Sequence, residues 1–171
     1  MLKKGALLLG LLLNFTGYGQ YAGAVTDFRS PLDIPLILAG TFGELRSNHF
    51  HAGIDIKTQQ RQGLPVYSIN EGTVSRIKIS HWGYGKALYI THPNGYTSVY
   101  AHLQKFGPEI EKYVKDLQYK KQKYELEVFP EFGALSVTKG DTIAYSGNTG
   151  GSSGPHLHFE IRNTLDEKPT N

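Results

Sequence analysis

The sequence predicts a mainly β fold built from antiparallel β-sheet, with one inserted helix around residues 107–123. Two observations favour the sheet: runs rich in β-branched and aromatic residues recur along the chain, and turns rich in Gly, Asn and Pro separate them. A third observation favours the helix, because apolar residues in that segment recur at helical spacing. At 171 residues the chain is long enough for one domain with its own core and short for two.

Residues 1–19 have the pattern of an export signal. Lys3 and Lys4 precede an apolar run of about 11 residues, which is too short for a membrane-spanning helix of ~20 residues. We therefore expect a signal peptide that is cleaved before Gln20 or a few residues later, and no membrane contact after cleavage. An uncleaved anchor or a buried terminal helix is the alternative. Residues 20–40 then form an N-terminal lead-in, and residues 41–171 form the functional domain.

The composition excludes several kinds of chemistry. The chain has no cysteine, so it has no disulfide, no thiol nucleophile and no lipid-modified cysteine. Its net charge of +3 is compatible with attraction to an anionic polymer, and equally with an ordinary solvated surface. The sequence contains no nucleic-acid-binding motif and no basic stripe with interleaved aromatic residues, so we expect no nucleic-acid partner.

The strands can be placed from their patterns. Residues 66–80 contain two strands on either side of a turn at Asn70–Gly72, and residues 86–103 predict a hairpin. The hairpin turn contains Asn94-Gly95, a pair that accepts positive φ angles. Alternation returns in residues 124–129 and again after a turn near Gly140, and a loop rich in Gly and Ser then leads to the last predicted strand.

The segment 107–132 is longer than a simple connection and contains the predicted helix. Pro108 occupies a position that a first helical turn tolerates, and acidic residues follow it while lysines come last, as the helix dipole favours. The residues at helical spacing are Ile110, Tyr113, Val114 and Leu117. This insertion could cap one end of a groove, restrict which substrates enter, dock a regulatory protein, or serve as a packed decoration.

The segment "GPHLHFEIR" (154–162) places two histidines on one strand face. Residues i and i+2 of a strand point the same way, so His156 and His158 face one site while Leu157 and Phe159 face the core. An isolated His-x-His is more often a pair of solvated side chains than a metal site. A second motif, "HFHAGIDI" (49–56), changes this balance because it adds a histidine and a carboxylate.

His51 and Asp55 would lie about 13 Å apart on a fully extended strand. They can bind one ion only if the backbone bends between them, and Gly53 permits such a bend. Together with one histidine of the C-terminal pair they form a set of two histidines and one carboxylate. This set is typical of catalytic zinc sites that keep a position open for water, and it also describes non-haem iron oxygenases.

Three motifs in order, "HAGID", "YAHL" and "GNTGGSSGPHLHFE", closely resemble the lysostaphin and LytM-like zinc metalloendopeptidases of bacterial cell walls. The resemblance covers residues 41–162. It implies a substrate groove across an antiparallel sheet, one Zn²⁺ per chain, and peptide cross-links of peptidoglycan as substrate. It also implies that the exported protein is periplasmic or associated with the cell wall. Carried over motif by motif, the zinc ligands fall on His51, Asp55 and His158.

The same resemblance implies that His102 and His156 are the catalytic residues. In this chemistry zinc activates water and polarises the peptide carbonyl, while a neutral imidazole takes a proton and passes it to the leaving amine. Which histidine is the base stays open. Two alternatives also stay open: a non-catalytic wall-binding regulator of other hydrolases, and a structural zinc module closed by His49 or Glu160.

Two other patterns are misleading. Residues 150–154 match Gly-x-Ser-x-Gly, but a nucleophile elbow must open a helix, and here a proline and a strand follow. The "GYGK" segment (83–86) lacks the rest of a phosphate-binding loop. Arg46 and Asn48 either line the groove or have an ordinary structural role, and Tyr84 and Tyr100 either stack on the substrate or pack in the fold. His81 and His92 are expected to be structural or solvated histidines.

Overall fold

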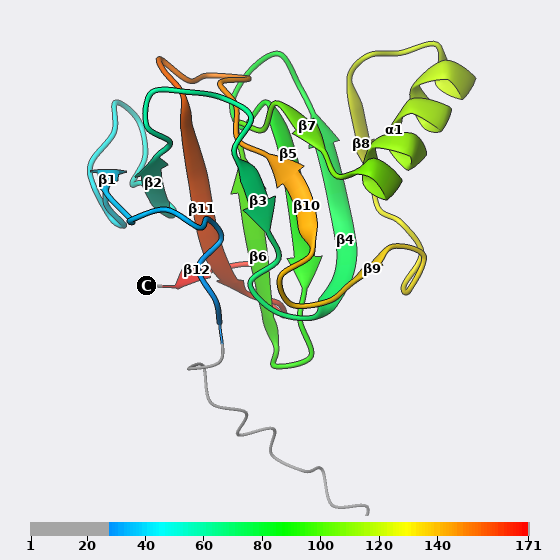
Figure 1. Cartoon of the computed structure of the whole chain (residues 1–171), viewed down its shortest axis with the longest axis horizontal. Coiled ribbons are helices and arrows are strands. Elements are labelled where there is room, and N and C mark those ends of the chain that lie inside the picture. The colour runs from blue at the N-terminus through cyan, green and yellow to red at the C-terminus, as the bar shows by residue number, and fades with distance from the viewer. Residues whose placement is uncertain (1–27, 171) are drawn as a thin grey trace, which may run out of the picture.

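The computed structural model describes residues 28–170, and the expected signal peptide lies outside them. Antiparallel β-sheet and one helix make up the described part of the fold, as predicted, and the strands form two sheets (Figure 1). The main sheet runs in the order β1 (Leu38–Gly40), β2 (Ile54–Lys57), β11 (His156–Asn163), β6 (Tyr96–Ala101), β5 (Lys86–Thr91), β4 (Gly72–Ile79) and β8 (Leu126–Val128). Two short strands extend it, since β12 (Pro169–Thr170) pairs with β11 and β9 (Ser136–Val137) pairs with β4.

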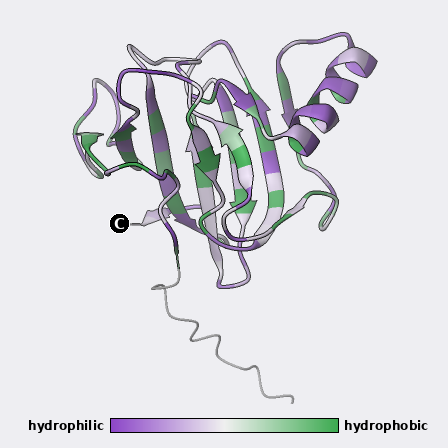
Figure 2. Cartoon of the chain, viewed as in Figure 1, coloured by the Kyte–Doolittle hydropathy of each residue, from purple (hydrophilic) through white to green (hydrophobic). Residues whose placement is uncertain are grey.

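The second sheet consists of β3 (Pro65–Tyr67), β10 (Thr142–Tyr145) and β7 (Lys105–Phe106). In Figure 1 it lies in front of β6 and β5. The hydrophobic core joins the two sheets: Tyr100 and Leu88 of the main sheet are fully buried in the same cluster as Val66 and Ile143 of the second. Strands of the main sheet therefore alternate between apolar and polar residues, as the colours of Figure 2 show.

The hairpin predicted for residues 86–103 is present as β5 and β6. The strands predicted in residues 66–80 are also present, but β3 and β4 belong to different sheets. The stretch 20–40 contributes more than a connection in its described part, because Leu32 is buried in the core and β1 pairs with β2. In the described part of the chain, no helix is long and apolar enough to cross a membrane.

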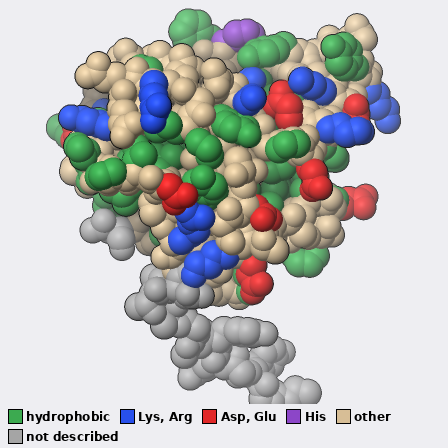
Figure 3. Space-filling model, in the orientation of Figure 1, with side chains coloured by type: hydrophobic (Ala, Val, Ile, Leu, Met, Phe, Trp, Pro, Cys, Tyr) green, Lys and Arg blue, Asp and Glu red, His purple; other side chains and the backbone are tan. Residues whose placement is uncertain are grey.

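The predicted helix is α1 (Pro108–Lys121), with Pro in its first turn and Gly107 as its N-cap. The side chain of Glu111 accepts a hydrogen bond of 2.9 Å from the backbone N–H of Phe106, which orders the entry to the helix. Ile110 and Val114 are buried against the core. On the face drawn in Figure 3, basic and acidic side chains alternate over this end of the molecule, as on an ordinary solvated surface.

Strand alternation decides which face of the main sheet carries the polar residues. On β11, Leu157 and Phe159 belong to the core between the sheets, so His156 and His158 point to the opposite face. On β2, Ile56 belongs to that core, so Asp55 points to the opposite face as well. The candidate site therefore lies on the face of the main sheet that turns away from the second sheet.

Candidate metal centre

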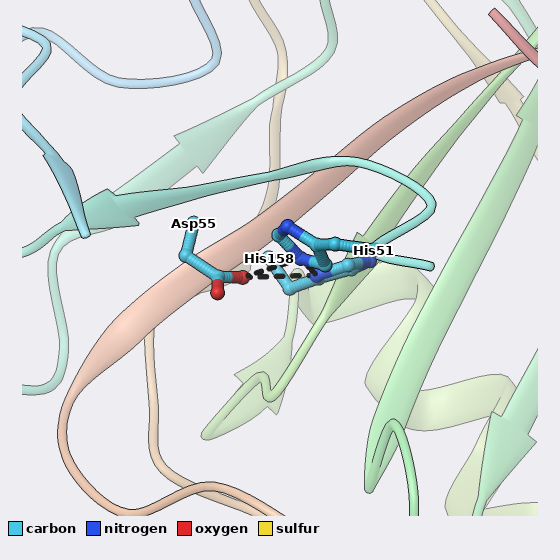
Figure 4. Close-up of side chains that lie close together, drawn as sticks. All are labelled: His51, Asp55 and His158. Atoms are coloured by element: carbon cyan, nitrogen blue, oxygen red, sulfur yellow. Dashed lines mark hydrogen bonds and ion pairs between the residues drawn. The ribbon is translucent and has the colours of Figure 1, made fainter. Parts of the chain in front are cut away.

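Three side chains of metal-ligand type converge where β2 meets β11 (Figure 4). The antiparallel register places Asp55 directly opposite His158, and His51 reaches them from the segment that precedes β2. The chain bends at Gly53, as the sequence predicted, so His51 and Asp55 approach each other. One ligand atom of each residue lies within 4.8 Å of the others, and all three residues are buried.

Hydrogen bonds on the outer side of each imidazole fix which nitrogen carries the hydrogen. Nδ1 of His51 lies 2.8 Å from the carbonyl oxygen of Thr41, and Nε2 of His158 lies 2.7 Å from Oε1 of Glu160. A carbonyl and a carboxylate only accept, so these two nitrogens donate. In the neutral rings, Nε2 of His51 and Nδ1 of His158 are therefore free of hydrogen and present lone pairs to the site.

The three atoms that face the centre of the site are therefore all hydrogen-bond acceptors, yet they lie very close together. Nε2 of His51 is 3.0 Å from Nδ1 of His158, and the two nitrogens are 3.2 and 3.0 Å from Oδ1 of Asp55. Three lone-pair donors aimed at one point repel each other unless a cation lies between them. The geometry therefore fits a metal ion. Two imidazoles and a carboxylate are a common zinc set, and non-haem iron accepts the same donors.

Arg46 holds the carboxylate of Asp55 in place. Its Nη2 lies 2.8 Å from Oδ2 of Asp55, so the other carboxylate oxygen turns to the histidines. The same nitrogen is 3.3 Å from Nδ1 of His51, farther away than the carbonyl of Thr41. Burial alone would raise the pKa of Asp55, but in the metal-free protein a protonated His156 or His158 donates a hydrogen bond to it, which outweighs burial and holds the pKa well below its usual range. Asp55 is therefore ionised, as a metal ligand must be.

His102 lies beside the centre, directly after β6. Its Nδ1 is 2.8 Å from the carbonyl oxygen of Thr149 and donates to it, which leaves Nε2 as an acceptor. Burial lowers the pKa of His102 to about 4, so the ring is neutral at pH 7. Its backbone has φ of 57°, a left-handed conformation that is strained for a residue with a side chain. Such strain concentrates at functional sites.

His156 completes the group. Its Nδ1 lies 2.8 Å from the carbonyl oxygen of Gly154, and its Nε2 lies 3.5 Å from Oδ1 of Asp55. The ring centroids of His102 and His156 are 4.7 Å apart. Both rings therefore direct a nitrogen that can accept a proton into the space beside the three candidate ligands. The structure thus brings all five predicted site residues together.

These residues line a cavity of about 870 Å³. Arg46 and Tyr84 also line it, in agreement with one of the two interpretations the sequence left open for each. Tyr100 does not: it is fully buried, and its hydroxyl accepts a hydrogen bond of 3.1 Å from the backbone of Ile69. No residue of the insertion 107–132 lines the cavity, and α1 packs at the opposite end of the sheet near β8. Of the alternatives for this insertion, the structure therefore does not support a cap over the groove.

Neither residue considered as a fourth ligand belongs to the converging group. Glu160 bonds the outer nitrogen of His158, and His49 is exposed with its Nδ1 2.6 Å from Oδ1 of Asn48. Among the described residues, the group of metal-ligand type therefore holds three protein ligands. The other two histidines are remote from it: His81 is exposed beside Glu125, and His92 is buried at the far end of the β5–β6 hairpin.

Sequence reasoning did not foresee the supporting contacts of Glu160. This side chain is 1% exposed and bonds His158, Arg162 and the hydroxyl of Tyr84. The signal was present, because residue i+2 on a strand shares the face of His158. The backbone carbonyls of Thr41 and Thr149 carry no such signal, since the position of a carbonyl depends on the path of the loop.

Comparison with known proteins identifies the family of this chain. The model of "Peptidase family M23" matches residues 49–119 and 134–171. The chain belongs to peptidase family M23. The matched residues include His51, Asp55, His158 and His102, and the gap between the two matched ranges, residues 120–133, falls on the second half of the insertion and the residue after it.

Two curated relatives are similar to this M23 chain over only part of their own length. An "Uncharacterized metalloprotease" of Haemophilus influenzae is 36% identical over 65% of this chain and 18% of that protein. "Peptidoglycan DD-endopeptidase ShyC" of Vibrio cholerae is 28% identical over 94% of this chain and 33% of that protein. The chain thus spans a third or less of the length of these two relatives.

Solved structures confirm the fold. A "zinc containing peptidase" from Vibrio cholerae is similar with a TM-score of 0.60 and 26% identity, over 84% of this chain and 38% of that one. The catalytic domain of lysostaphin from Staphylococcus simulans has a TM-score of 0.54 and 24% identity, over 77% and 83% of the two chains. The mainly β, antiparallel fold predicted from the sequence is therefore confirmed.

Proposed function

We propose that this protein is an exported zinc endopeptidase that hydrolyses peptide cross-links of peptidoglycan. The observation that carries the proposal is the convergence of three hydrogen-free acceptor atoms of His51, Asp55 and His158 within 3.2 Å of one another. Membership of peptidase family M23 and the similarity to a peptidoglycan DD-endopeptidase support the substrate class. The positively charged, apolar N-terminal pattern supports export to the periplasm or cell wall.

His51, Asp55 and His158 would hold one Zn²⁺, which would supply a Lewis acid that activates water and polarises the peptide carbonyl. His102 or His156 takes the proton of the attacking water on its bare Nε2 and returns it to the leaving amine. The carbonyls of Thr149 and Gly154 hold these rings in the required tautomer. No covalent intermediate with the protein is needed.

The cavity also supplies positive charge for the oxyanion that develops on the peptide carbonyl. Asp55 is the one acidic residue among its described lining, and the cationic Arg46 offsets its charge. A protonated His102 or His156 adds a donor at the moment when the attacking water has lost its proton. The arrangement is therefore suited to stabilise a tetrahedral anion.

The test combines metal content with cleavage. The purified chain should contain about one zinc per molecule and should convert cross-linked muropeptide dimers into monomers. Zinc without cleavage of any cross-link type would support the wall-binding regulator instead. Absence of zinc from a folded preparation would remove the basis of the proposal. Docking of a regulatory protein on the insertion stays a prediction.

A further inference from the structure

One wall of the catalytic cavity carries a cation that the proposed reaction does not use. Lys57 ends β2 two residues after Asp55, so both side chains point to the cavity face of the sheet. The antiparallel register pairs Lys57 directly with His156, just as it pairs Asp55 with His158. Directly opposed side chains lie about 5 Å apart at their Cβ atoms. The lysine stem therefore begins beside a proposed catalytic histidine.

Lys57 differs from the other cation in the cavity, Arg46. The guanidinium of Arg46 already forms ion pairs with Asp55 and Glu44. Lys57 is exposed and forms no ion pair with any residue in the described range 28–170. Its ammonium group is therefore free to bind an anion that enters the cavity.

The loop after Lys57 is built to hold two further polar side chains at the same wall. Gln59 and Gln60 both line the cavity and both have left-handed backbones, with φ of 57° and 59°. The buried Thr58 supports this conformation, because its hydroxyl donates to the carbonyl of Arg61 at 2.8 Å. Two consecutive strained residues without glycine are costly, and such strain is retained at ligand clamps.

We propose that Lys57, flanked by Gln59 and Gln60, binds a carboxylate of the substrate peptide. The cavity then prefers a peptide with a free carboxylate within one or two residues of the scissile bond over the same peptide with a carboxamide there. A carboxylate accepts charge-assisted hydrogen bonds from the ammonium group, and the glutamine amides can donate to it as well. The inference rests on the proposed peptidase function and names a class of substrate for it.

The experiment uses two cross-linked peptides that differ only in this carboxylate or carboxamide. The zinc-loaded protein should cleave the carboxylate form with a kcat/KM about tenfold higher, and Lys57→Met should lose that preference by slowing cleavage of the carboxylate form alone. Lys57→Arg should retain most of the preference. Lys120→Met removes an equal charge from the exposed last turn of α1 and should behave as the parent does.

A binding measurement separates this inference from the proposed function. Calorimetry with the His102→Ala protein compares the affinity of the two peptides without cleavage, with and without Lys57→Met. A carboxylate preference that Lys57→Met abolishes supports the inference, even if no cross-link is ever cut. Equal affinity for both peptides, or a preference that survives Lys57→Met, overturns the inference about Lys57. In either case, cleavage of cross-links by the parent protein leaves the peptidase proposal intact.

Discussion

Glu160 and Asp55 lie on opposite sides of the same imidazole, that of His158. Oε1 of Glu160 lies 2.7 Å from Nε2 of His158, and Oδ1 of Asp55 lies 3.0 Å from Nδ1. The buried glutamate thereby fixes the ring and its tautomer, and the free nitrogen faces the site. A carboxylate on the outer nitrogen of a metal-binding histidine also makes the ligand more basic.

We therefore predict that Glu160 sets the affinity for zinc without binding it. Glu160→Gln should weaken zinc binding because the negative charge is lost, and Glu160→Ala should weaken it more, by about 10- to 100-fold. Competition with a chromophoric chelator measures the affinity. Circular dichroism of both variants checks the fold, because Arg162 also loses its partner. Unchanged affinity in two folded variants would contradict the role of Glu160.

A second prediction separates metal binding from proton transfer. His102→Ala should keep its zinc and lose about 10²- to 10⁴-fold in kcat, because the neutral ring lies beside the three proposed ligands and is not one of them. Asp55→Ala should lose zinc and activity together, since Asp55 is a proposed ligand. His49→Ala is the matched control and should retain both. Loss of zinc from a folded His102→Ala protein would contradict this division.

Features that depend on local sequence could be predicted, whereas features that depend on contacts between distant segments could not. Strands, the hairpin and α1 arise from local periodicity, and the His51, Asp55 and His158 set came from motifs whose order resembles a family. The separation of β3 and β4 into different sheets depends on contacts across the whole fold. The carbonyls that orient His51 and His102 depend on loop paths, which side-chain types do not encode. The position of the insertion, away from the cavity, is likewise a tertiary property.

A third prediction concerns Gly53, where the backbone bends and also packs closely against β11. A Cβ at this position would lie 2.2 Å from the carbonyl oxygen of Phe159 and 2.7 Å from Cγ of Glu160. Gly53→Ala should therefore push β2 from β11, lower the melting temperature and weaken zinc binding together. Gly154→Ala is the control for stability, since a Cβ there meets no atom within 4 Å. A Gly53→Ala protein as stable as the parent would show that the strands can shift at no cost.

The last prediction concerns stability at acidic pH and a histidine outside the site. His92 is 3% exposed, and burial lowers its pKa below the usual 6.5. The unfolded chain therefore binds a proton to this residue at a higher pH than the folded protein does. Stability is fully present above pH 6.5 and is lost as the pH falls through that value towards the lower folded pKa.

His92→Gln should reduce this acid sensitivity. At pH 8 the variant should be less stable by about 1–3 kcal/mol, because the buried contacts to Ser98 and to the carbonyl of Glu71 are disturbed. Between pH 8 and pH 5 its stability should fall less than that of the parent. Urea unfolding with a chelator in every sample measures both values without a contribution from zinc. His81→Gln alters an exposed histidine and should keep the parent's pH dependence; equal slopes for His92→Gln and the parent would show that other groups cause the acid sensitivity.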